Sequence, residues 1–417
     1  MTPPDPKALG RRAQAMIEAL ADISAEPDRL VRLYLTPEHR RAMDLVAGWM
    51  REAGLEVSED ELATLKGRLP GRGNRRLLIG SHMDTVIDAG RFDGTLGVVA
   101  GVLAAEHFAR QERPLPFGLD VLAFGDEEGS RFPTTLATSS GVAGVFQEAA
   151  LDSADGAGVT LRDALVRFGK DPSRTREAAY DKGEVLGYVE VHIEQGPVLE
   201  QDGLALGVVT CIVGQSRLNV TVRGEAGHAG TVPMDRRRDA FLAGAEMALA
   251  AERIALEGAA HGMVGTVGRV EVGPGAVNII PGSAAFTLDL RAATDPPRLE
   301  AVGAFRRGAQ RIAQRRGCTV AFDHFHEIGS TPCASWIQEE LHGAVADLGQ
   351  PIRRLVSGAG HDGHAMAHLT EIGMLFVRCR GGISHNPAEF ATPEDMGLAV
   401  AALIRFVERL AERGEEA

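Results

Sequence analysis

Cysteine is scarce in this sequence. There are four among 417 residues, with no C-x-x-C pair, and they stand far apart at Cys211, Cys318, Cys333 and Cys379. Zinc ribbons, thioredoxin-like redox motifs and disulfide frameworks need cysteines that are closely spaced or numerous. The sequence supports none of these, and we expect a protein of a reducing compartment, the cytoplasm.

Basic charge and long apolar runs are lacking as well. Lys and Arg total 44 against 57 Asp and Glu, which gives a net charge of −13. Nucleic acids and anionic membranes are bound mainly through clustered basic side chains, so we expect neither as a partner. Uncharged apolar runs such as residues 95–105 fall well short of the roughly 18 residues that span a bilayer. Residues 1–10 are polar and proline-rich, without the pattern of a signal peptide.

Several common catalytic motifs are missing too. The sequence has no G-x-S-x-G elbow, no Walker A motif and no G-x-G-x-x-G after a predicted strand. No cysteine stands beside a candidate catalytic motif. A serine nucleophile on such an elbow, a P-loop nucleotide site, a dinucleotide site and a thiol nucleophile are therefore unsupported.

Apolar residues and glycine are plentiful. Hydrophobic residues make up 44% and charged residues 24%, which is ordinary for a globular protein with a substantial core. The length favours two or three domains. The 50 glycines follow no period and gather around polar clusters, which indicates many tight turns near sites.

Short apolar segments alternate with helical patterns along most of the chain. We expect helices over residues 7–54, 95–110 and 393–413. Strands are predicted at 76–79, 119–124, 186–193, 353–356 and 373–377. Such alternation predicts an α/β domain whose mostly parallel sheet is covered by helices.

Residues 214–327 have a different pattern. Strand 217–223 alternates apolar and polar residues, so one face is exposed. The predicted order is then a helix at 235–257, strands at 264–272 and 284–291, a helix at 297–316 and a strand at 318–326. This β-α-β-β-α-β order predicts an inserted ferredoxin-like lid or dimerisation domain, with residues 1–213 and 328–417 forming the catalytic domain.

Polar clusters follow the predicted parallel strands at their carboxyl ends, where open α/β sheets hold their ligands. Each cluster alone is compatible with a surface histidine, a solvated acidic turn or a hydrogen-bonded buried histidine. Together they place five potential ligands in one crevice: His82, Asp93, Glu128, His192 and His385. A set of imidazoles and carboxylates without thiolates suits zinc, manganese or cobalt.

The motifs GSHMDTV, GRFDGTLGV, GDEEGSRF, VHIEQGPVLE, GEAGHAGTVPM, NIIPG, LDLR, SGAGHD and GISHNPAE run from about residue 79 to 390. With them the chain resembles the M20 metallopeptidase-like superfamily, in its hydantoinase/carbamoylase branch. HIEQGPVLE and GHAGTVPM separate this branch from ordinary M20 peptidases. The sequence departs from the branch at Gly363-His364, where many members carry Ala or Ser, which bears on the substrate pocket.

The resemblance implies two divalent metal ions, zinc or manganese, with cobalt possible. One would be held by His82, Asp93 and His192, and the other by Asp93, Glu128 and His385, so that Asp93 bridges them. Glu127 would be the general base, and Asp84 would orient His82. His228 would stabilise the oxyanion from the partner subunit of a homodimer. The implied substrate contacts are Gln195, Gln215, His228, Asn278 and Arg291.

The implied activity is hydrolysis of a ureido or carbamoyl C–N bond in a small substrate that carries a carboxylate. Allantoate is the first candidate substrate, with release of ammonia and carbon dioxide. N-carbamoyl-L-amino acid hydrolase and β-ureidopropionase activities are alternatives. An M20 dipeptidase is a more remote one, since His192 stands where peptidases usually have a carboxylate. A non-catalytic scaffold would be favoured only by loss of a ligand or of Glu127, and all of these are present.

Overall fold

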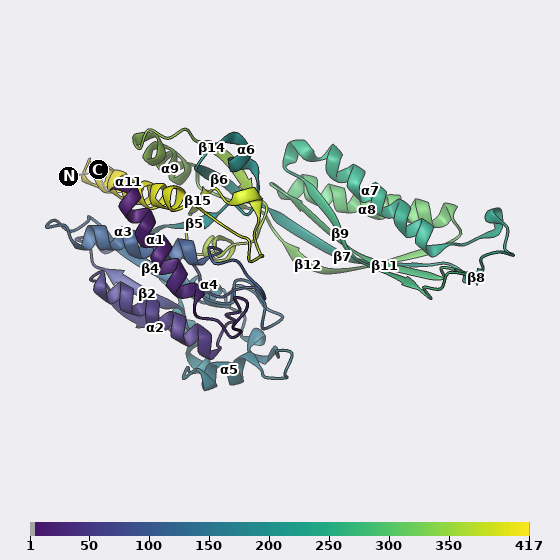
Figure 1. Cartoon of the computed structure of the whole chain (residues 1–417), viewed down its shortest axis with the longest axis horizontal. Coiled ribbons are helices and arrows are strands. Elements are labelled where there is room, and N and C mark those ends of the chain that lie inside the picture. Colours follow the sequence, from purple (N-terminus) through teal and green to yellow (C-terminus); the bar gives the residue numbers. More distant parts are fainter. Residues whose placement is uncertain (1–4, 417) are drawn as a thin grey trace. The chain divides into compact units, whose positions relative to one another are not determined.

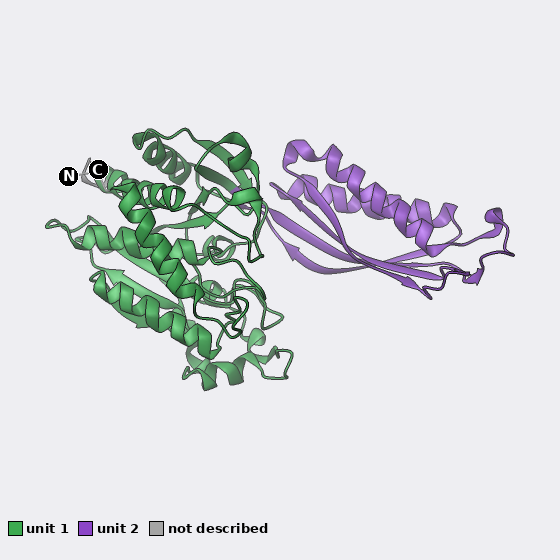
Figure 2. Cartoon of the chain, viewed as in Figure 1, with its two compact units in different colours: residues 1–210, 332–417 green, residues 211–331 purple. Residues whose placement is uncertain are grey.

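A computed structural model describes residues 5–416, and the chain divides into two compact units (Figure 2). The first comprises the chain up to Thr210 and from Pro332 onward, and the second is Cys211–Thr331. The range predicted for the inserted domain, 214–327, lies inside the second unit. Among the described residues, no helix combines the length and apolarity needed to cross a membrane.

The first unit is built on a sheet with the strand order β1-β2-β4-β3-β5-β15-β6-β13, in which β14 also pairs with β6. Its strands are β1 (Glu56–Glu59), β2 (Leu65–Leu69), β3 (Arg76–His82), β4 (Gly118–Phe124), β5 (Val185–Ile193), β6 (Leu206–Ile212), β13 (Thr331–Pro332), β14 (Arg353–Ser357) and β15 (Ile372–Val377). The central strands β4, β3, β5 and β15 are parallel. Strands β2 and β6 flank them in antiparallel pairing. The predicted α/β class with a mainly parallel sheet is therefore confirmed.

Burial explains why the central strands were recognisable. Every residue of β4 and β15 is buried, as expected for parallel strands covered on both faces. Such strands have near-continuous apolar sequences, which stand out from their polar surroundings. The carboxyl ends of the four parallel strands meet at one edge of the sheet, and this edge carries the site described below.

Helices cover this sheet (Figure 1). The longer ones are α1 (Pro6–Ala21), α2 (Pro37–Glu52), α3 (Thr95–Ala109), α9 (Ser335–Asp347) and α11 (Pro393–Glu416), and the shorter ones are α4 (Ala137–Val142), α5 (Leu161–Arg167), α6 (Val198–Asp202) and α10 (Gly363–Met366). Helix α3 is almost wholly buried, while α1 packs against α3 and α11. The helical pattern of residues 7–54 forms two helices, α1 and α2, with residues 22–36 between them. Thr36 caps a new helix with Pro37 in its first turn, where a missing N–H costs nothing.

The second unit has its own core and an antiparallel sheet in the order β12-β7-β11-β9. Its elements are β7 (Gly214–Arg223), α7 (Ala240–Glu257), β9 (Val264–Gly273), β11 (Ser283–Ala292), α8 (Asp295–Arg315) and β12 (Thr319–Ile328). This is the β-α-β-β-α-β order, with both helices packed on the sheet. A separate two-stranded ribbon joins β8 (Gly227–His228) to β10 (Ile279–Ile280).

Candidate metal centre

The five potential ligands come together at the carboxyl edge of the parallel strands. His82 ends β3, His192 is the next-to-last residue of β5, and Glu128 follows β4. Asp93 lies just before α3, and His385 lies in the loop after β15. His82, Asp93 and His192 are buried, the Glu128 side chain is 7% exposed, and the His385 side chain is half exposed.

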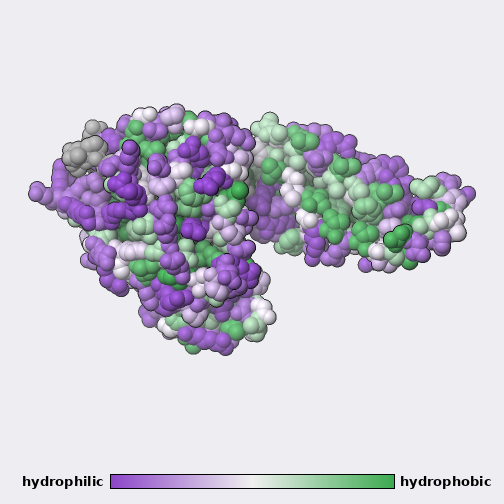
Figure 3. All heavy atoms as spheres, in the orientation of Figure 1, coloured by the Kyte–Doolittle hydropathy of each residue, from purple (hydrophilic) through white to green (hydrophobic). Residues whose placement is uncertain are grey.

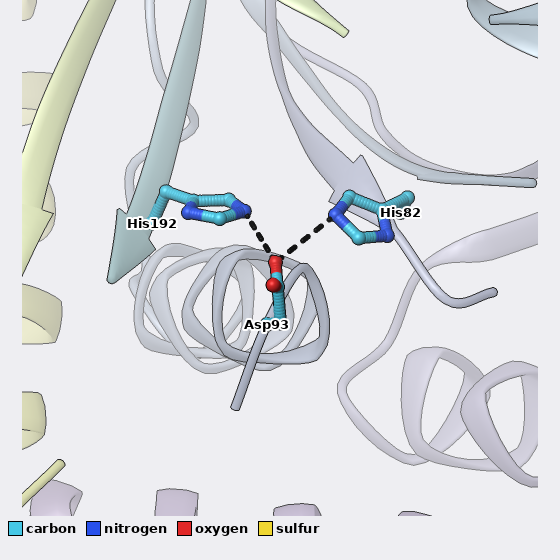
Figure 4. A group of neighbouring side chains, drawn as sticks. All are labelled: His82, Asp93 and His192. Carbon is cyan, nitrogen blue, oxygen red and sulfur yellow. Dashed lines mark ion pairs between the residues drawn. The ribbon is translucent and has the colours of Figure 1, made fainter. Parts of the chain in front are cut away.

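Asp93 is the centre of the cluster because its two carboxylate oxygens face different partners. Its Oδ1 lies 3.1 Å from His192 Nε2 and 3.5 Å from His82 Nε2 (Figure 4). Its Oδ2 lies 3.3 Å from His385 Nε2. A carboxylate arranged in this way can hold one cation on each oxygen.

Glu128 completes the second group. Its Oε2 lies 3.5 Å from His385 Nε2, and the ligand atoms of Asp93, Glu128 and His385 all lie within 4.8 Å of one another. The same holds for His82, Asp93 and His192. Two ligand groups that share one carboxylate fit a pair of divalent cations, and nitrogen and oxygen donors without sulfur suit zinc, manganese or cobalt.

Glycine at position 94 lets this cluster close up. Gly94 has φ +66°, and a Cβ there would lie 2.5 Å from the imidazole of His82. Any side chain would therefore be strained and would push His82 away from Asp93. Strain is also present in Gln195 and His385, with φ of 55° and 53°, values that residues other than glycine seldom adopt.

Asp84 holds two loops together. Its backbone carbonyl accepts the hydrogen bond from His82 Nδ1 at 3.1 Å, whereas its carboxylate oxygen is 3.7 Å from that nitrogen. The carboxylate instead accepts the backbone N–H groups of Glu127 and Glu128, both at 3.2 Å. Asp84 thus fixes the His82 ring through its main chain and the acidic loop after β4 through its side chain.

Glu127 and Glu128 both face the site, while their neighbour Asp126 turns away to accept a hydrogen bond from Thr134 Oγ1 at 3.1 Å. Glu127 Oε2 lies 4.0 Å from His82 Nε2. Burial, followed by the charge of Glu128, raises the pKa of Glu127 well above its usual value, although His82 opposes this. The raised pKa makes Glu127 a stronger base than an exposed glutamate, and it lies beside the candidate ligands but outside the Asp93-centred pairs.

Burial also governs the ligands. It raises the pKa of Glu128 to about 7, with the Asp93 charge adding to the effect. Hydrogen bonding to Asp93 raises the pKa of His385 to about 9. Burial opposes a rise in the pKa of His82, but Asp93 and the nearby acids raise it well above its usual value. These shifts follow from the close packing of acidic and imidazole groups in a buried place.

Glu190, His192 and His361 form another close group. The two oxygens of Glu190 already accept hydrogen bonds from Ser81 Oγ, Tyr188 Oη and Gly363 N. His361 pairs through Nε2 with Ser357 Oγ at 2.7 Å, and its ring packs edge-on against His192 with centroids 4.5 Å apart. This group supports the His192 ring from behind.

Gln195 contacts the centre directly. Its Nε2 donates to Asp93 Oδ2 at 2.8 Å and to Ser384 Oγ at 3.2 Å. The position that the resemblance assigns to substrate contact is thus hydrogen-bonded to the central carboxylate. Close by in the chain, Glu194 caps α6 by accepting the backbone N–H groups of Val198 and Leu199. His364, the departure from the branch pattern, is buried on α10.

The other candidate substrate contacts lie in the second unit, in two separate places. Gln215 and Arg291 are register partners on β7 and β11, and Arg291 pairs with Asp289 at 2.9 Å. His228 and Asn278 are exposed on the β8–β10 ribbon, where Ala229 N bonds Asn278 O at 2.9 Å. His228 Nδ1 accepts from Gly230 N at 3.0 Å, so the neutral ring carries its proton on the exposed Nε2.

These two places are at opposite ends of the second unit. From Gln215 to Arg223 the chain runs along β7 for roughly 26 Å, at about 3.3 Å per residue, and the ribbon comes after that end (Figure 1). A small substrate is far shorter. One substrate molecule therefore cannot contact both places of the same unit.

Sequence reasoning missed Glu389, Ser384 and Gln195 as direct partners of Asp93. Ser384 Oγ donates to Asp93 Oδ2 at 2.9 Å, and Glu389 Oε1 accepts from Asp93 N at 3.1 Å. Their nearness in sequence to His385 and His192 was visible, but nothing in the sequence shows which way a loop turns its side chains.

Residues 78–409 match the model of peptidase family M20/M25/M40. The chain belongs to this family. The family is one of metal-dependent hydrolases, and the ligand groups at the edge of the sheet accord with membership. Its M20 relatives include allantoate deiminase 1 of Glycine max, with 39% identity over 97% of this chain and 90% of that protein.

A second M20 relative is the N-carbamoyl-L-amino acid amidohydrolase of Geobacillus stearothermophilus, which is 39% identical over 97% of this chain and 99% of that protein. Among solved structures, a hydantoinase/carbamoylase family amidase from Burkholderia multivorans matches with a TM-score of 0.90 and 33% identity. The match covers 96% of this chain and 98% of that one. Likeness over whole chains places this protein beside amidohydrolases within the M20 family.

Proposed function

We propose that this protein is a two-metal amidohydrolase that cleaves a ureido or carbamoyl C–N bond, with allantoate as its first substrate. The observation that carries the proposal is Asp93, whose two oxygens face separate groups of imidazole and carboxylate ligands. The names of its relatives supply the substrate class: allantoate in one case and N-carbamoyl-L-amino acids in the other.

His82, Asp93 and His192 would hold one divalent ion, and Asp93, Glu128 and His385 the other. Zinc or manganese fits these donors, and cobalt is possible. A bound metal pair lowers the pKa of a water toward neutrality and polarises the carbonyl to be attacked. The chain's own contribution is to fix the ligands through the Asp84 loop, the Gly94 turn and the His361 ring.

Glu127 is the proposed general base. Its side chain is 12% exposed, it lies beside the ligands without belonging to the Asp93-centred pairs, and its pKa is raised. A carboxylate in this state can accept the proton of the attacking water and then give it to the leaving nitrogen. If the leaving nitrogen is the one attached to the central carbon of allantoate, it stays there as an amine, and the rest of the ureido arm departs as carbamate, which breaks down to ammonia and carbon dioxide.

Arg291 and Gln215 would bind the substrate carboxylate, for which a guanidinium offers two parallel N–H donors. Arg291 is already aligned by Asp289. His228, with an exposed Nε2–H, would donate to the oxyanion of the tetrahedral intermediate. The pair Gln215 and Arg291 lies at least about 26 Å from His228 and Asn278 along β7. His228 and Asn278 would therefore serve the active site of a second copy.

A homodimer through the second unit is therefore part of the proposal. Strand β9 is an edge of its sheet, and exposed apolar side chains line the strand and the neighbouring helix α7. Phe241, Leu249 and Val270 border a groove of about 610 Å³ there. Figure 3 shows apolar side chains gathered over this unit. An open strand edge beside an apolar helix face suits pairing with the same surface of a second copy.

The cytoplasmic location expected from the sequence stays part of the proposal. It is supported by the small number and wide spacing of the cysteines, which is unlike a disulfide framework.

An ammonia-release assay tests the substrate choice. Metal-reconstituted enzyme would be given allantoate, ureidoglycolate, several N-carbamoyl-L-amino acids and a dipeptide at equal concentrations. We expect the highest kcat/KM on allantoate and none on the dipeptide. Faster turnover of the carbamoyl amino acids would make the protein an N-carbamoyl-L-amino acid hydrolase, and a strict preference for the dipeptide would overturn the amidohydrolase assignment.

A further inference from the structure

Glu389 is a buried carboxylate that belongs to none of the ligand groups. Its Oε1 accepts the backbone N–H groups of Phe92 at 2.8 Å and Asp93 at 3.1 Å. Its Oε2 lies 2.8 Å from the hydroxyl of Ser384, the neighbour of His385. One side chain therefore connects the loop that carries Asp93 with the loop that carries His385.

Ser384 continues this connection to the central carboxylate. Its Oγ lies 2.9 Å from Asp93 Oδ2 and also accepts from Gln195 Nε2 at 3.2 Å. The hydroxyl has a single hydrogen, so it can donate either to Asp93 or to Glu389 at a given moment. The orientation of Asp93 Oδ2, the oxygen that faces His385, thus depends on a small network ending at Glu389.

The chain makes room for Glu389 at Gly90. A Cβ at this position would lie 2.2 Å from the Glu389 carboxyl carbon and 2.4 Å from its Cβ. These distances leave no space for a side chain at position 90. The Cβ of Glu389 is fixed to its backbone and cannot move aside. Gly90 and Glu389 therefore fit each other, close to the backbone of residues 92 and 93.

We propose that Glu389 is a positioning residue that holds the Asp93 loop against the His385 loop and so sets the geometry of the second ligand group. The proposal rests on the two-metal function above. Glu389 would act through hydrogen bonds to Asp93 N, Phe92 N and Ser384 Oγ and would not touch a cation. Its removal should weaken binding most at the group of Asp93, Glu128 and His385.

The test measures Mn²⁺ binding to metal-stripped full-length protein by competition with a chelating dye. We expect Glu389→Ala to lower the affinity for one of the two Mn²⁺ ions by about tenfold or more, as removal of a hydrogen-bonding partner of a metal ligand commonly does. Glu389→Gln should stay within about threefold of wild type. Its amide oxygen can accept both backbone N–H groups, and its amide N–H₂ can donate to Ser384, which leaves the hydroxyl hydrogen for Asp93.

Asp60→Ala is the matched control. Asp60 is a buried carboxylate whose Oδ1 accepts two backbone N–H groups, from Leu62 at 3.0 Å and Thr64 at 2.9 Å, and neither of these residues is a proposed ligand. It should lower thermal stability without changing Mn²⁺ affinity. If Glu389→Ala does not fold, Ser384→Ala, which removes the hydroxyl that lies between Glu389 and Asp93, should also lower Mn²⁺ affinity by about tenfold or more.

Wild-type affinity in the alanine variants, or equal losses in Glu389→Ala and Glu389→Gln, would overturn the positioning role. Failure of the wild-type protein to bind two ions would count against the proposed function instead. The two failures are thus distinguishable in one experiment.

Discussion

Glu127 and Glu128 are adjacent in sequence, yet their surroundings assign them different chemistry. Glu128 lies 3.5 Å from His385, within the group that also contains Asp93. Glu127 lies 4.0 Å from His82 and is held against Glu128 by the carboxylate of Asp84. A ligand and a base can both be supplied by one turn because Asp84 fixes both backbone amides.

Glu127→Gln should keep its metal but lose about 100-fold or more in kcat, which is typical for removal of a general base. The amide keeps the size of the side chain and cannot accept the proton. Metal content by elemental analysis and steady-state rates on the preferred substrate check this. Glu128→Gln is the matched control and should lose bound metal as well as rate. Near wild-type turnover in Glu127→Gln would remove Glu127 from its role.

Metal binding should weaken strongly in acid. Metal ligands must be deprotonated, and in the metal-free protein the pKa of His385 is raised to about 9, those of His82 and His192 are raised, and that of Glu128 is raised to about 7. Protons bound to these groups compete with the cation. The affinity of the protein for the metal should therefore rise with pH up to about pH 9 and decrease steadily at lower pH.

We expect Mn²⁺ affinity to drop by about tenfold or more for each pH unit between 8 and 6, with proton release visible in calorimetry as a dependence on buffer ionisation enthalpy. His385→Ala should have a shallower pH dependence. An affinity that does not change across this range would contradict the raised pKa values of the ligands.

At the scale of elements, the parallel strands could be predicted because burial on both faces gives them continuous apolar sequences. The ligand cluster could then be predicted as well, because polar residues that follow parallel strands lie at the same edge of the sheet. The antiparallel additions β1, β2 and β6 were missed, as were α4, α5 and α9. Strands such as β1 are short and mostly exposed, so their sequence carries little apolar signal.

The finer contacts of the site could not be predicted for a different reason. The two loops that Glu389 connects are almost 300 positions apart in the chain, and the connection depends on how each loop turns. The sequence indicated Asp84 as a partner of His82, but its carboxylate is used by the backbone of the next loop. Local pattern identifies residue types, whereas these hydrogen bonds are set by the packed backbone.

Gly94→Ala tests how far the start of α3 controls the centre. The new Cβ would lie 2.5 Å from the His82 ring, at a φ of +66° that disfavours it. We expect His82 to be displaced and its metal to be bound about tenfold or more weakly. Gly203→Ala has a similar φ of +68° with open space around it, so it carries the backbone cost alone. Equal metal affinity in the two variants would show that the lack of a side chain at Gly94 does not control the metal site.

At the scale of the whole molecule, the second unit carries the proposed substrate contacts at two ends. Gln215 follows the first unit by five residues along the chain, while His228 lies beyond the far end of β7. Under the proposed dimer, Arg291 would serve the active site of its own chain and His228 that of its partner. The division explains why an inserted domain would carry both an exposed histidine at its tip and an edge strand for pairing.

Complementation between inactive variants tests this division. Glu127→Gln and His228→Ala would be co-expressed with different tags, and the mixed species purified as a check on assembly. Random pairing makes half of the dimers mixed. In each mixed dimer, one of the two active sites has both Glu127 and His228. The activity of the whole preparation should therefore recover to about a quarter of the wild-type activity. Co-expressing Glu127→Gln with Arg291→Ala should give no such recovery on allantoate, because Arg291 would be missing from the only site with an intact base. Mixed dimers that form but stay inactive in the first pair would show that His228 does not act across the interface, and recovery in the second pair would move Arg291 to the partner's site.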